Sequence, residues 1–205
     1  LNCIQAAERA GVEIPSYCWH PALSVVASCR MCLVEVGQKK PDGTVAMQPK
    51  LIPGCQTPVT DGMVCHTETP AVKQAQDDVL EFLLVNHPLD CPVCDRGGEC
   101  ELQEVIFDWG DLEERFTEKK TAQPEKYLSP IVANDPQRCI LCKRCTRVCD
   151  EWMGEDAIEA RQVAVVHQLE ILLHRHEQGC EAGWVGDRYG VDGNKAANHC
   201  KTSPS

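Results

Sequence analysis

Three groups of cysteines, one of which includes a histidine, are the residues of this sequence whose types and spacing could do chemistry. The first group consists of Cys18, Cys29 and Cys32, with Cys55 further along the chain. A C-x2-C pair lets two thiolates bind a metal from a single turn, and two more cysteines complete four sulfur ligands. Four thiolates suit zinc or an iron-sulfur cluster, and their spacing alone leaves both open.

The second group has the spacing H-x3-C-x2-C-x5-C, and its members are His87, Cys91, Cys94 and Cys100. Three thiolates and one imidazole also satisfy zinc as a Cys3His site, so zinc stays open here too. Pro88 follows the histidine and holds it in an extended conformation. Because His87 lies four residues from a C-x2-C pair, we expect it to be a ligand rather than a surface or core histidine.

The third group has the spacing C-x2-C-x2-C-x3-C, and its members are Cys139, Cys142, Cys145 and Cys149. This spacing is that of the bacterial ferredoxin loop, in which three thiolates from one tight turn hold a cluster. In two-cluster ferredoxins the fourth cysteine binds the other cluster and is followed by proline, whereas Asp150 follows here. The fourth ligand therefore stays open between Cys149 and the distant Cys180.

The composition favours metal ligands over disulfides and excludes some functions. The 205 residues include 15 cysteines, an odd number, so complete internal disulfide pairing is impossible. A net charge of -11 repels phosphate backbones and predicts that the chain does not bind nucleic acid. The apolar runs at 163–166 and 171–173 are too short to span a bilayer. No nucleophile-base pair or phosphate loop is evident, so we expect electron transfer rather than a substrate site.

The remaining cysteines and histidines lack ligand spacing. We expect Cys3 and Cys65 to be ordinary small buried residues. Three further histidines, for which we expect a solvated helix face, are His167, His174 and His176.

The secondary-structure elements predicted to position these groups are mainly strands near the N-terminus and mainly helices after residue 69. Residues 2–10 have helical periodicity after a capping Asn2, and the segments 32–36, 51–55 and 63–67 read as extended strands between turn signals. A longer helix is predicted from Pro70, capped by Thr69. Further expectations are short helices at 99–110 and 111–120, a polar linker at 121–130, an amphipathic helix at 161–178, and little order in the last twenty-odd residues.

In combination these motifs resemble the N-terminal iron-sulfur region of the large electron-transfer subunit, the G-type or 75 kDa polypeptide, of respiratory complex I (NADH:quinone oxidoreductase). Residues 16–36 with 53–64 resemble its plant-ferredoxin-type 2Fe-2S domain. Residues 86–103 are similar to its His-Cys3 4Fe-4S segment, and residues 135–151 to its next 4Fe-4S loop. The resemblance covers roughly residues 1–160 and is specific because three motifs occur together.

The resemblance implies one 2Fe-2S cluster and one or two 4Fe-4S clusters. The implied 2Fe-2S ligands are Cys18, Cys29, Cys32 and Cys55. The implied ligands of the first 4Fe-4S cluster are His87, Cys91, Cys94 and Cys100. For the second they are Cys139, Cys142 and Cys145, with Cys149 or Cys180 as the fourth.

The fold implied is α+β. A plant-ferredoxin-like β-grasp domain, incomplete at its N-terminus, would occupy residues 1–68, and a small helical His-Cys3 cluster domain residues 69–120. A partial bacterial-ferredoxin-like cluster segment would follow at 121–160, and an unrecognised tail, poorly ordered, at 161–205. We expect a chain truncated at both ends, because the first ferredoxin strands and the family's downstream segments are not evident.

The function implied is to pass electrons from an NADH-oxidising, FMN-binding flavoprotein subunit towards quinone, within the peripheral arm of the complex. The chain would then lie in the cytoplasm, on the inner face of the plasma membrane. A first alternative is the diaphorase iron-sulfur subunit of a soluble NAD-linked hydrogenase or formate dehydrogenase, which shares these motifs. A non-redox alternative is a protein-interaction module whose fold is held together by bound zinc. Such a zinc protein would be colourless.

Overall fold

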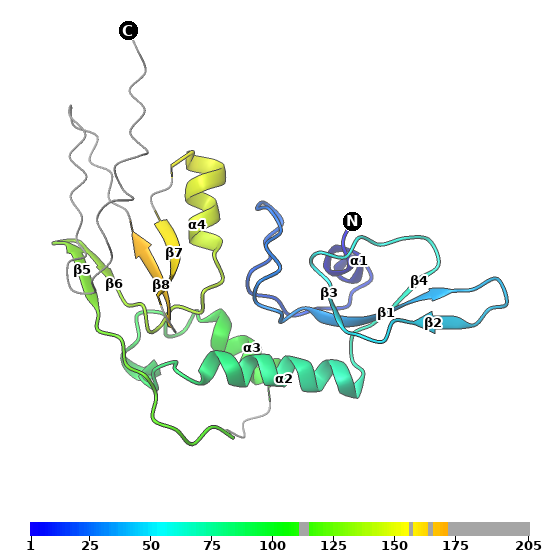
Figure 1. Cartoon of the computed structure of the whole chain (residues 1–205), viewed down its shortest axis with the longest axis horizontal. Helices are drawn as coiled ribbons and strands as arrows, with labels where there is room; N and C mark the ends of the chain where they lie inside the picture. The colour runs from blue at the N-terminus through cyan, green and yellow to red at the C-terminus, as the bar shows by residue number, and fades with distance from the viewer. Residues whose placement is uncertain (111–114, 156–157, 164–165, 172–205) are drawn as a thin grey trace, which may run out of the picture.

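An antiparallel sheet around one strand, β1 (Leu33–Lys39), forms the N-terminal part of the computed structural model, which describes residues 1–110, 115–155, 158–163 and 166–171. β1 pairs with β2 (Val45–Met47), β3 (Ile52–Pro53) and β4 (Met63–His66) (Figure 1). A Cβ at Gly37 would lie 2.5 Å from Sδ of Met47 and 3.0 Å from the backbone oxygen of Ala46, so a larger residue there would displace β2. The three predicted strands are confirmed, and β2 is an addition.

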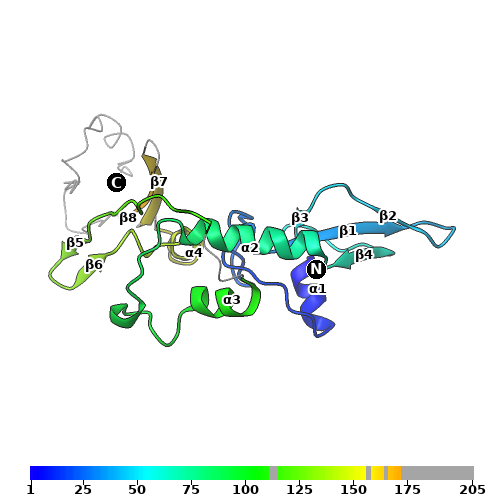
Figure 2. The same ribbon diagram turned by 90° about the horizontal axis from the view of Figure 1, so that it is seen from below.

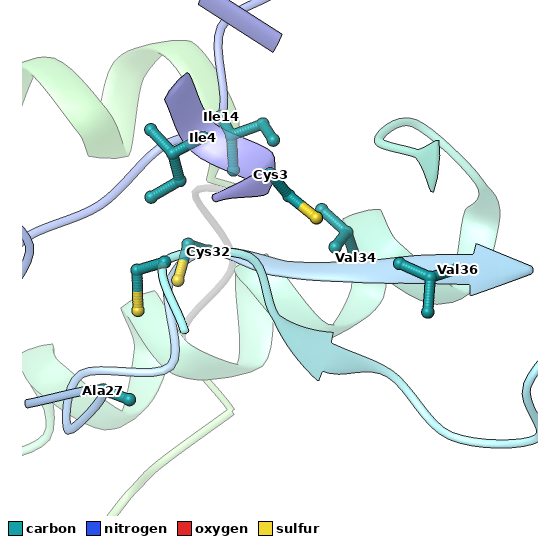
Figure 3. Close-up of a cluster of buried hydrophobic side chains, with 8 residues drawn as sticks. Cys3, Ile4, Ile14, Ala27, Cys32, Val34 and Val36 are labelled. Carbon is teal, nitrogen blue, oxygen red and sulfur yellow. The ribbon is translucent and has the colours of Figure 1, made fainter. Parts of the chain in front are cut away.

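The short helix α1 (Cys3–Arg9) packs on this sheet and confirms the predicted N-terminal helix. Its capping box joins Asn2 and Gln5: the Gln5 N–H donates to Asn2 Oδ1 at 2.9 Å, and the Asn2 N–H donates to Gln5 Oε1 at 3.1 Å. Figure 3 shows Cys3 of α1 pointing towards Val34 of β1. The buried residues of this core are Cys3, Ile4, Ile14, Ala27, Cys32, Val34, Val36 and Cys55.

Two helices follow, and both were predicted. α2 (Pro70–Leu84) is capped by the preceding residue, Thr69, whose hydroxyl accepts a hydrogen bond from the Val72 N–H at 3.3 Å. α3 (Glu101–Trp109) begins directly after Cys100. In both overall views α2 runs from the sheet towards the hairpins at the other end of the chain (Figure 1, Figure 2). In the described part of the chain no helix is both long and apolar enough to cross a bilayer.

A second buried core joins α2 and α3 to the loop that precedes β1. We call it the central cluster, and its members are Tyr17, Met31, Leu80 and Leu102. One thiol from each cysteine group packs against it: Cys29, Cys100 and Cys142. The three groups therefore share one apolar support, although they are far apart in sequence.

The segment that carries the third cysteine group continues as α4 (Arg144–Arg147) and a π-helical turn, η2 (Val148–Met153). A hairpin of β5 (Lys126–Ser129) and β6 (Val132–Asn134) precedes it, and β5 lies within the stretch predicted as a polar linker. The linker prediction was wrong over β5, because a four-residue strand paired with its neighbour across a tight turn leaves little periodicity to read.

The predicted amphipathic helix at 161–178 was wrong over its described part. β7 (Ile158–Val163) and β8 (Val166–Ile171) form an antiparallel hairpin, with Val163 paired to Val166. Short apolar runs are ambiguous between helix and strand, and the β-branched Val163, Val166 and Ile171 favour the strand. Residues 172–178 and the expected unordered tail lie outside the described residues.

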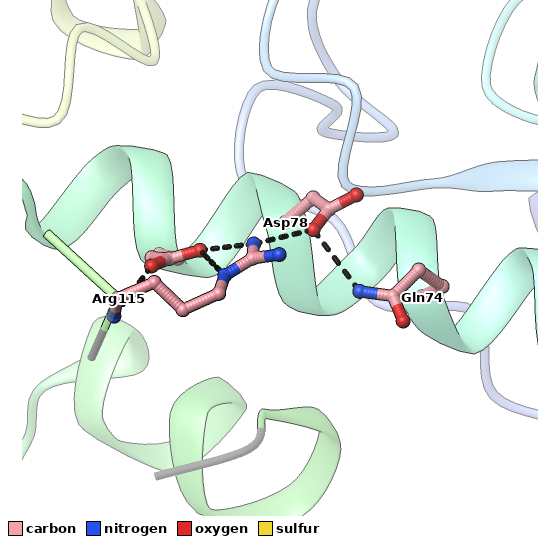
Figure 4. A network of polar contacts seen from close by, with 4 residues as sticks. Gln74, Asp78 and Arg115 are labelled. Atoms are coloured by element: carbon pink, nitrogen blue, oxygen red, sulfur yellow. Dashed lines mark hydrogen bonds and ion pairs between the residues drawn. The ribbon is translucent and has the colours of Figure 1, made fainter. Parts of the chain in front are cut away.

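The predicted helix at 111–120 is absent over its described residues, 115–120. Arg115 instead binds α2 (Figure 4): its Nε donates to Glu81 Oε2 at 2.7 Å and its Nη2 to Asp78 Oδ1 at 2.7 Å. Gln74 donates to the same Asp78 oxygen at 3.1 Å. These contacts hold the chain against α2, and residues 111–114 lie outside the described part.

Truncating the central cluster should destabilise the fold much more than truncating an exposed residue of the same helix. Leu80 is 2% exposed and Phe82 is 79% exposed. Leu80→Ala should lower the free energy of unfolding by about 2–5 kcal/mol because it leaves a cavity, and Phe82→Ala should change it by no more than about 0.5 kcal/mol. Urea unfolding of the cluster-loaded chain, followed by far-UV circular dichroism, measures both. Equal losses would show that the central cluster does not support the fold.

Candidate metal centres

The first cysteine group is assembled by the sheet. Cys32 directly precedes β1 and Cys55 follows β3, and the two strands pair at Leu33 and Pro53. The thiols of Cys29 and Cys55 both hydrogen-bond to Cys18, and the thiol of Cys55 also bonds to Cys32. The structure thus brings the four predicted sulfurs into one connected group, of which three are fully buried.

Hydrogen bonds within this group favour the thiolate form at two of its four cysteines. Hydrogen bonds from Cys29 and then Cys55 hold the pKa of the Cys18 thiol well below its usual range, and the bond with Cys55 lowers the pKa of Cys32 to about 7. The backbone N–H of Cys18 also donates to Sγ of Cys29 at 3.4 Å. The same hydrogen bonds raise the pKa of Cys29 and Cys55, so the arrangement favours the metal-binding thiolate form at Cys18 and Cys32.

The loops that carry the first and third groups share an unusual backbone. Four non-glycine residues with positive φ occur in the described part of the chain: Ala27, Arg30, Leu141 and Lys143, at 48°, 63°, 55° and 59°. Two of them bracket Cys29 and two flank Cys142. Such residues cost about 1 kcal/mol or more each and concentrate at functional sites. Left-handed residues in a tight loop turn N–H groups inward and form anion-binding concavities of the kind found at iron-sulfur sites.

The second group lines a single cavity between the end of α2 and the start of α3. Its four predicted ligands are all in the wall: His87, Cys91, Cys94 and Cys100. Leu84, Leu102 and Ile106 add apolar side chains to the wall, and Asp90, Arg96 and Gln103 add polar ones. Burial lowers the pKa of His87, so its imidazole is neutral at pH 7 and free to bind a metal through nitrogen. A cavity lined by three cysteines and one histidine has the donor set of a 4Fe-4S group or zinc.

The third group is brought together only in part. Burial raises the pKa of Cys145, and nearby negative charge on Cys142 and Cys139 raises it further. The N–H of Leu141 donates to Sγ of Cys139 at 3.4 Å. Cys149 is buried on η2. The other candidate for the fourth position, Cys180, lies outside the described residues.

Three arginines fasten the third group to the other two. Arg138 donates to Asp90 at 2.7 Å, between His87 and Cys91 of the second group. Arg144 binds Glu101 at 2.8 Å and the Trp19 carbonyl at 3.2 Å.

Arg147 makes the link to the first group. It is 8% exposed and donates to the backbone carbonyls of Cys18, Ser24 and Lys143. A guanidinium has five donors in a fixed planar fork, so one side chain can tie several backbone segments together. The loop around the first group is thus anchored on α4.

Some features of the sites could not be read from the sequence. Tyr17 and Arg147 were missed because no spacing marks them, and their contacts span long sequence separations. The expectation for Cys3 is confirmed, since it is buried, but that for Cys65 was wrong: Cys65 is exposed, and its thiol bonds to that of Cys3. In the described part of the chain no three or more His, Cys, Asp or Glu side chains form a ready-made site for one metal ion.

Comparison with protein families gives two matches along the chain. Residues 2–70 match the 2Fe-2S iron-sulfur cluster binding domain, and residues 76–115 match the NADH-ubiquinone oxidoreductase-G iron-sulfur binding region. The first match spans the sheet, α1 and the first cysteine group, and the second spans the cavity with the His-Cys3 group. The chain therefore contains a 2Fe-2S domain with a mixed α/β, ferredoxin-like fold and a 4Fe-4S binding region.

Curated relatives share nearly half of their aligned residues with this chain. The NADH-quinone oxidoreductase G polypeptide of Rickettsia conorii is 46% identical over 179 residues, which are 85% of this chain and 25% of that protein. The NADH-ubiquinone oxidoreductase 75 kDa subunit of Reclinomonas americana is 46% identical over 151 residues, which are 74% of this chain and 20% of that protein. The chain spans about a quarter or less of the length of these curated relatives.

A solved structure is also similar. The crystal structure of NAD+-reducing [NiFe]-hydrogenase in the H2-reduced state contains a chain that aligns with a TM-score of 0.71 and 26% identity, over 83% of this chain and 68% of that one. The structural alignment covers more of the chain than the two family matches, which span residues 2–70 and 76–115. Over the part that these matches cover, the chain belongs to the family of G-type, or 75 kDa, iron-sulfur proteins of NADH-quinone oxidoreductase.

Proposed function

We propose that this chain is an iron-sulfur electron-transfer subunit of a respiratory NADH:quinone oxidoreductase (EC 7.1.1.-). The observation that carries the proposal is the central cluster, against which one thiol of each cysteine group packs. Electron transfer between redox centres requires short and fixed separations, and a shared rigid core supplies them. The chain itself binds no substrate: it holds the centres through which electrons pass.

The proposed 2Fe-2S ligands are Cys18, Cys29, Cys32 and Cys55, and the proposed ligands of the first 4Fe-4S cluster are His87, Cys91, Cys94 and Cys100. The connected sulfurs of the first group and the shared cavity of the second support this assignment. When bound, the clusters supply reversible one-electron chemistry. The chain's own residues fix their positions, exclude water through the apolar lining and present backbone N–H groups to sulfur. The sheet with α1 packed on it is compatible with a β-grasp domain.

A second 4Fe-4S cluster is proposed at Cys139, Cys142 and Cys145. The mutual electrostatic effect of these thiols and the left-handed loop around Cys142 support it. Its fourth ligand is Cys149 or Cys180. Cys149 is close in sequence, but in ferredoxin loops of this spacing the fourth cysteine serves a neighbouring cluster.

The proposed partners are an NADH-oxidising, FMN-binding subunit and other subunits of the peripheral arm, and the proposed location is the cytoplasmic face of the plasma membrane. The names of the relatives, which are NADH-quinone and NADH-ubiquinone oxidoreductase subunits, support membership of a multi-subunit oxidoreductase complex. A hydrogenase diaphorase subunit is a second candidate, favoured by the hydrogenase structure. Its 26% identity, against 46% for the Rickettsia protein, makes it the weaker one.

The metal content separates both redox functions from an interaction module stapled by zinc. Chain purified without oxygen should be brown, with charge-transfer absorption in the visible range, and should contain iron and acid-labile sulfide but little zinc. Zinc has a filled d shell, so a zinc protein would be colourless. Elemental analysis together with the visible spectrum tests this. Stoichiometric zinc without sulfide would overturn the proposal.

Replacing one proposed 2Fe-2S ligand should affect one cluster only. Cys55→Ser should remove or strongly perturb the reduced-state EPR signal of the 2Fe-2S cluster and leave the 4Fe-4S signals, because a serine oxygen replaces one of four thiolates. Cys65→Ser is the matched control, since Cys65 is exposed and bonds to Cys3. If Cys65→Ser removes the signal and Cys55→Ser preserves it, the fourth ligand is Cys65.

A further inference from the structure

Tyr17 carries a polar group that the fold buries without an evident partner. The residue is 1% exposed, and its hydroxyl oxygen has no hydrogen-bond partner among the described residues. Buried polar groups in proteins are almost always hydrogen-bonded, and an exception calls for an explanation such as a bound group. Phenylalanine would fill the same apolar space without the cost of burying an unpaired hydroxyl. The hydroxyl of Tyr17 therefore calls for a hydrogen-bond partner.

The position of Tyr17 indicates where that partner lies. Its ring belongs to the central cluster, against which Cys29 of the first group and Cys100 of the second pack. Its backbone continues directly into Cys18, whose N–H donates to Sγ of Cys29 at 3.4 Å. Tyr17 is thus carried by the loop that also carries Cys18 and Cys29, two of the four proposed ligands of the first group.

The surroundings of Tyr17 leave a sulfur as the fitting acceptor. The other members of the central cluster, Met31, Leu80 and Leu102, are apolar, and cysteine sulfurs lie around them. Sulfurs bound to iron carry negative charge, and hydrogen bonds to such sulfurs set the reduction potential of a cluster. A protonated phenol in a dry environment is a strong donor to an anionic acceptor.

We propose that the Tyr17 hydroxyl donates a hydrogen bond to an inorganic sulfide of the 2Fe-2S cluster bound by Cys29 and thereby raises the reduction potential of that cluster. The inference rests on the proposed function, because it requires a cluster at the first group. Tyr17 keeps its proton and its electrons throughout. The cluster takes up one electron from an external reductant, and the hydrogen bond strengthens because the reduced cluster is more negative.

The test is a redox titration of the full, cluster-loaded chain, followed by EPR. Tyr17→Phe should make the 2Fe-2S potential more negative, with about a tenfold loss in the equilibrium constant for reduction, or about 59 mV for one electron. The potential of the His-Cys3 cluster should not move. Tyr127→Phe is the matched control: Tyr127 is 74% exposed and its hydroxyl donates to Glu125 at 3.0 Å, so this variant should leave every potential unchanged.

A second measurement separates a hydrogen bond from a general effect on the fold. In deuterated buffer the reduced 2Fe-2S cluster should show several exchangeable deuteron couplings by electron-nuclear double resonance; Tyr17→Phe should remove one of them and leave those of backbone N–H groups such as that of Cys18. An unchanged 2Fe-2S potential, a shift confined to the His-Cys3 cluster, or the same set of couplings in the variant as in the wild-type chain would each overturn the proposal. Loss of the 2Fe-2S signal from the wild-type chain would instead contradict the proposed function.

Discussion

The packing of Tyr17, Met31, Leu80 and Leu102 into one buried cluster is the constraint on which the rest of the structure depends. Two of these residues come from the loop before β1, one from α2 and one from α3. Because each cysteine group places one thiol against this cluster, the three groups cannot move independently. Protein interiors are close-packed and transmit displacements, so a shift of one helix would alter the separations between all three groups.

Charge reinforces this apolar support. Arg138, Arg144 and Arg147 lie on the segment of the third group and bind carboxylates or carbonyls beside the first and second groups. Cations at these places suit the anionic clusters proposed here, in a chain whose net charge is -11. Arg147 is buried and bonds to three backbone carbonyls, so its positive charge is held next to the loop of Cys18. The same contacts that join the segments therefore place positive charge near the proposed clusters.

The sequence alone predicted the elements whose signals are local. The capped helices at Cys3–Arg9 and Pro70–Leu84 and the strands around β1 have side chains that mark their ends and periods. The hairpin at 158–171 was misread because short runs of valine and isoleucine fit both helix and strand. The spacing of the cysteines identified them as candidate ligands, but it could not predict the contacts that support them. Arg147, for example, donates to the Cys18 carbonyl from 129 positions away in the sequence. Such contacts follow from tertiary packing, which leaves no periodic trace in one sequence.

The central claim is that one rigid support holds neighbouring redox centres. Its most direct test is an EPR measurement of the spin-spin interaction between the reduced clusters. The fully reduced chain should show EPR signals that are broadened and relax faster than those of each cluster reduced alone, because neighbouring paramagnetic centres at short, fixed separations couple magnetically. Leu80→Ala, which loosens the central cluster, should weaken or spread this interaction. Independent, unbroadened signals in the fully reduced wild-type chain would contradict the account.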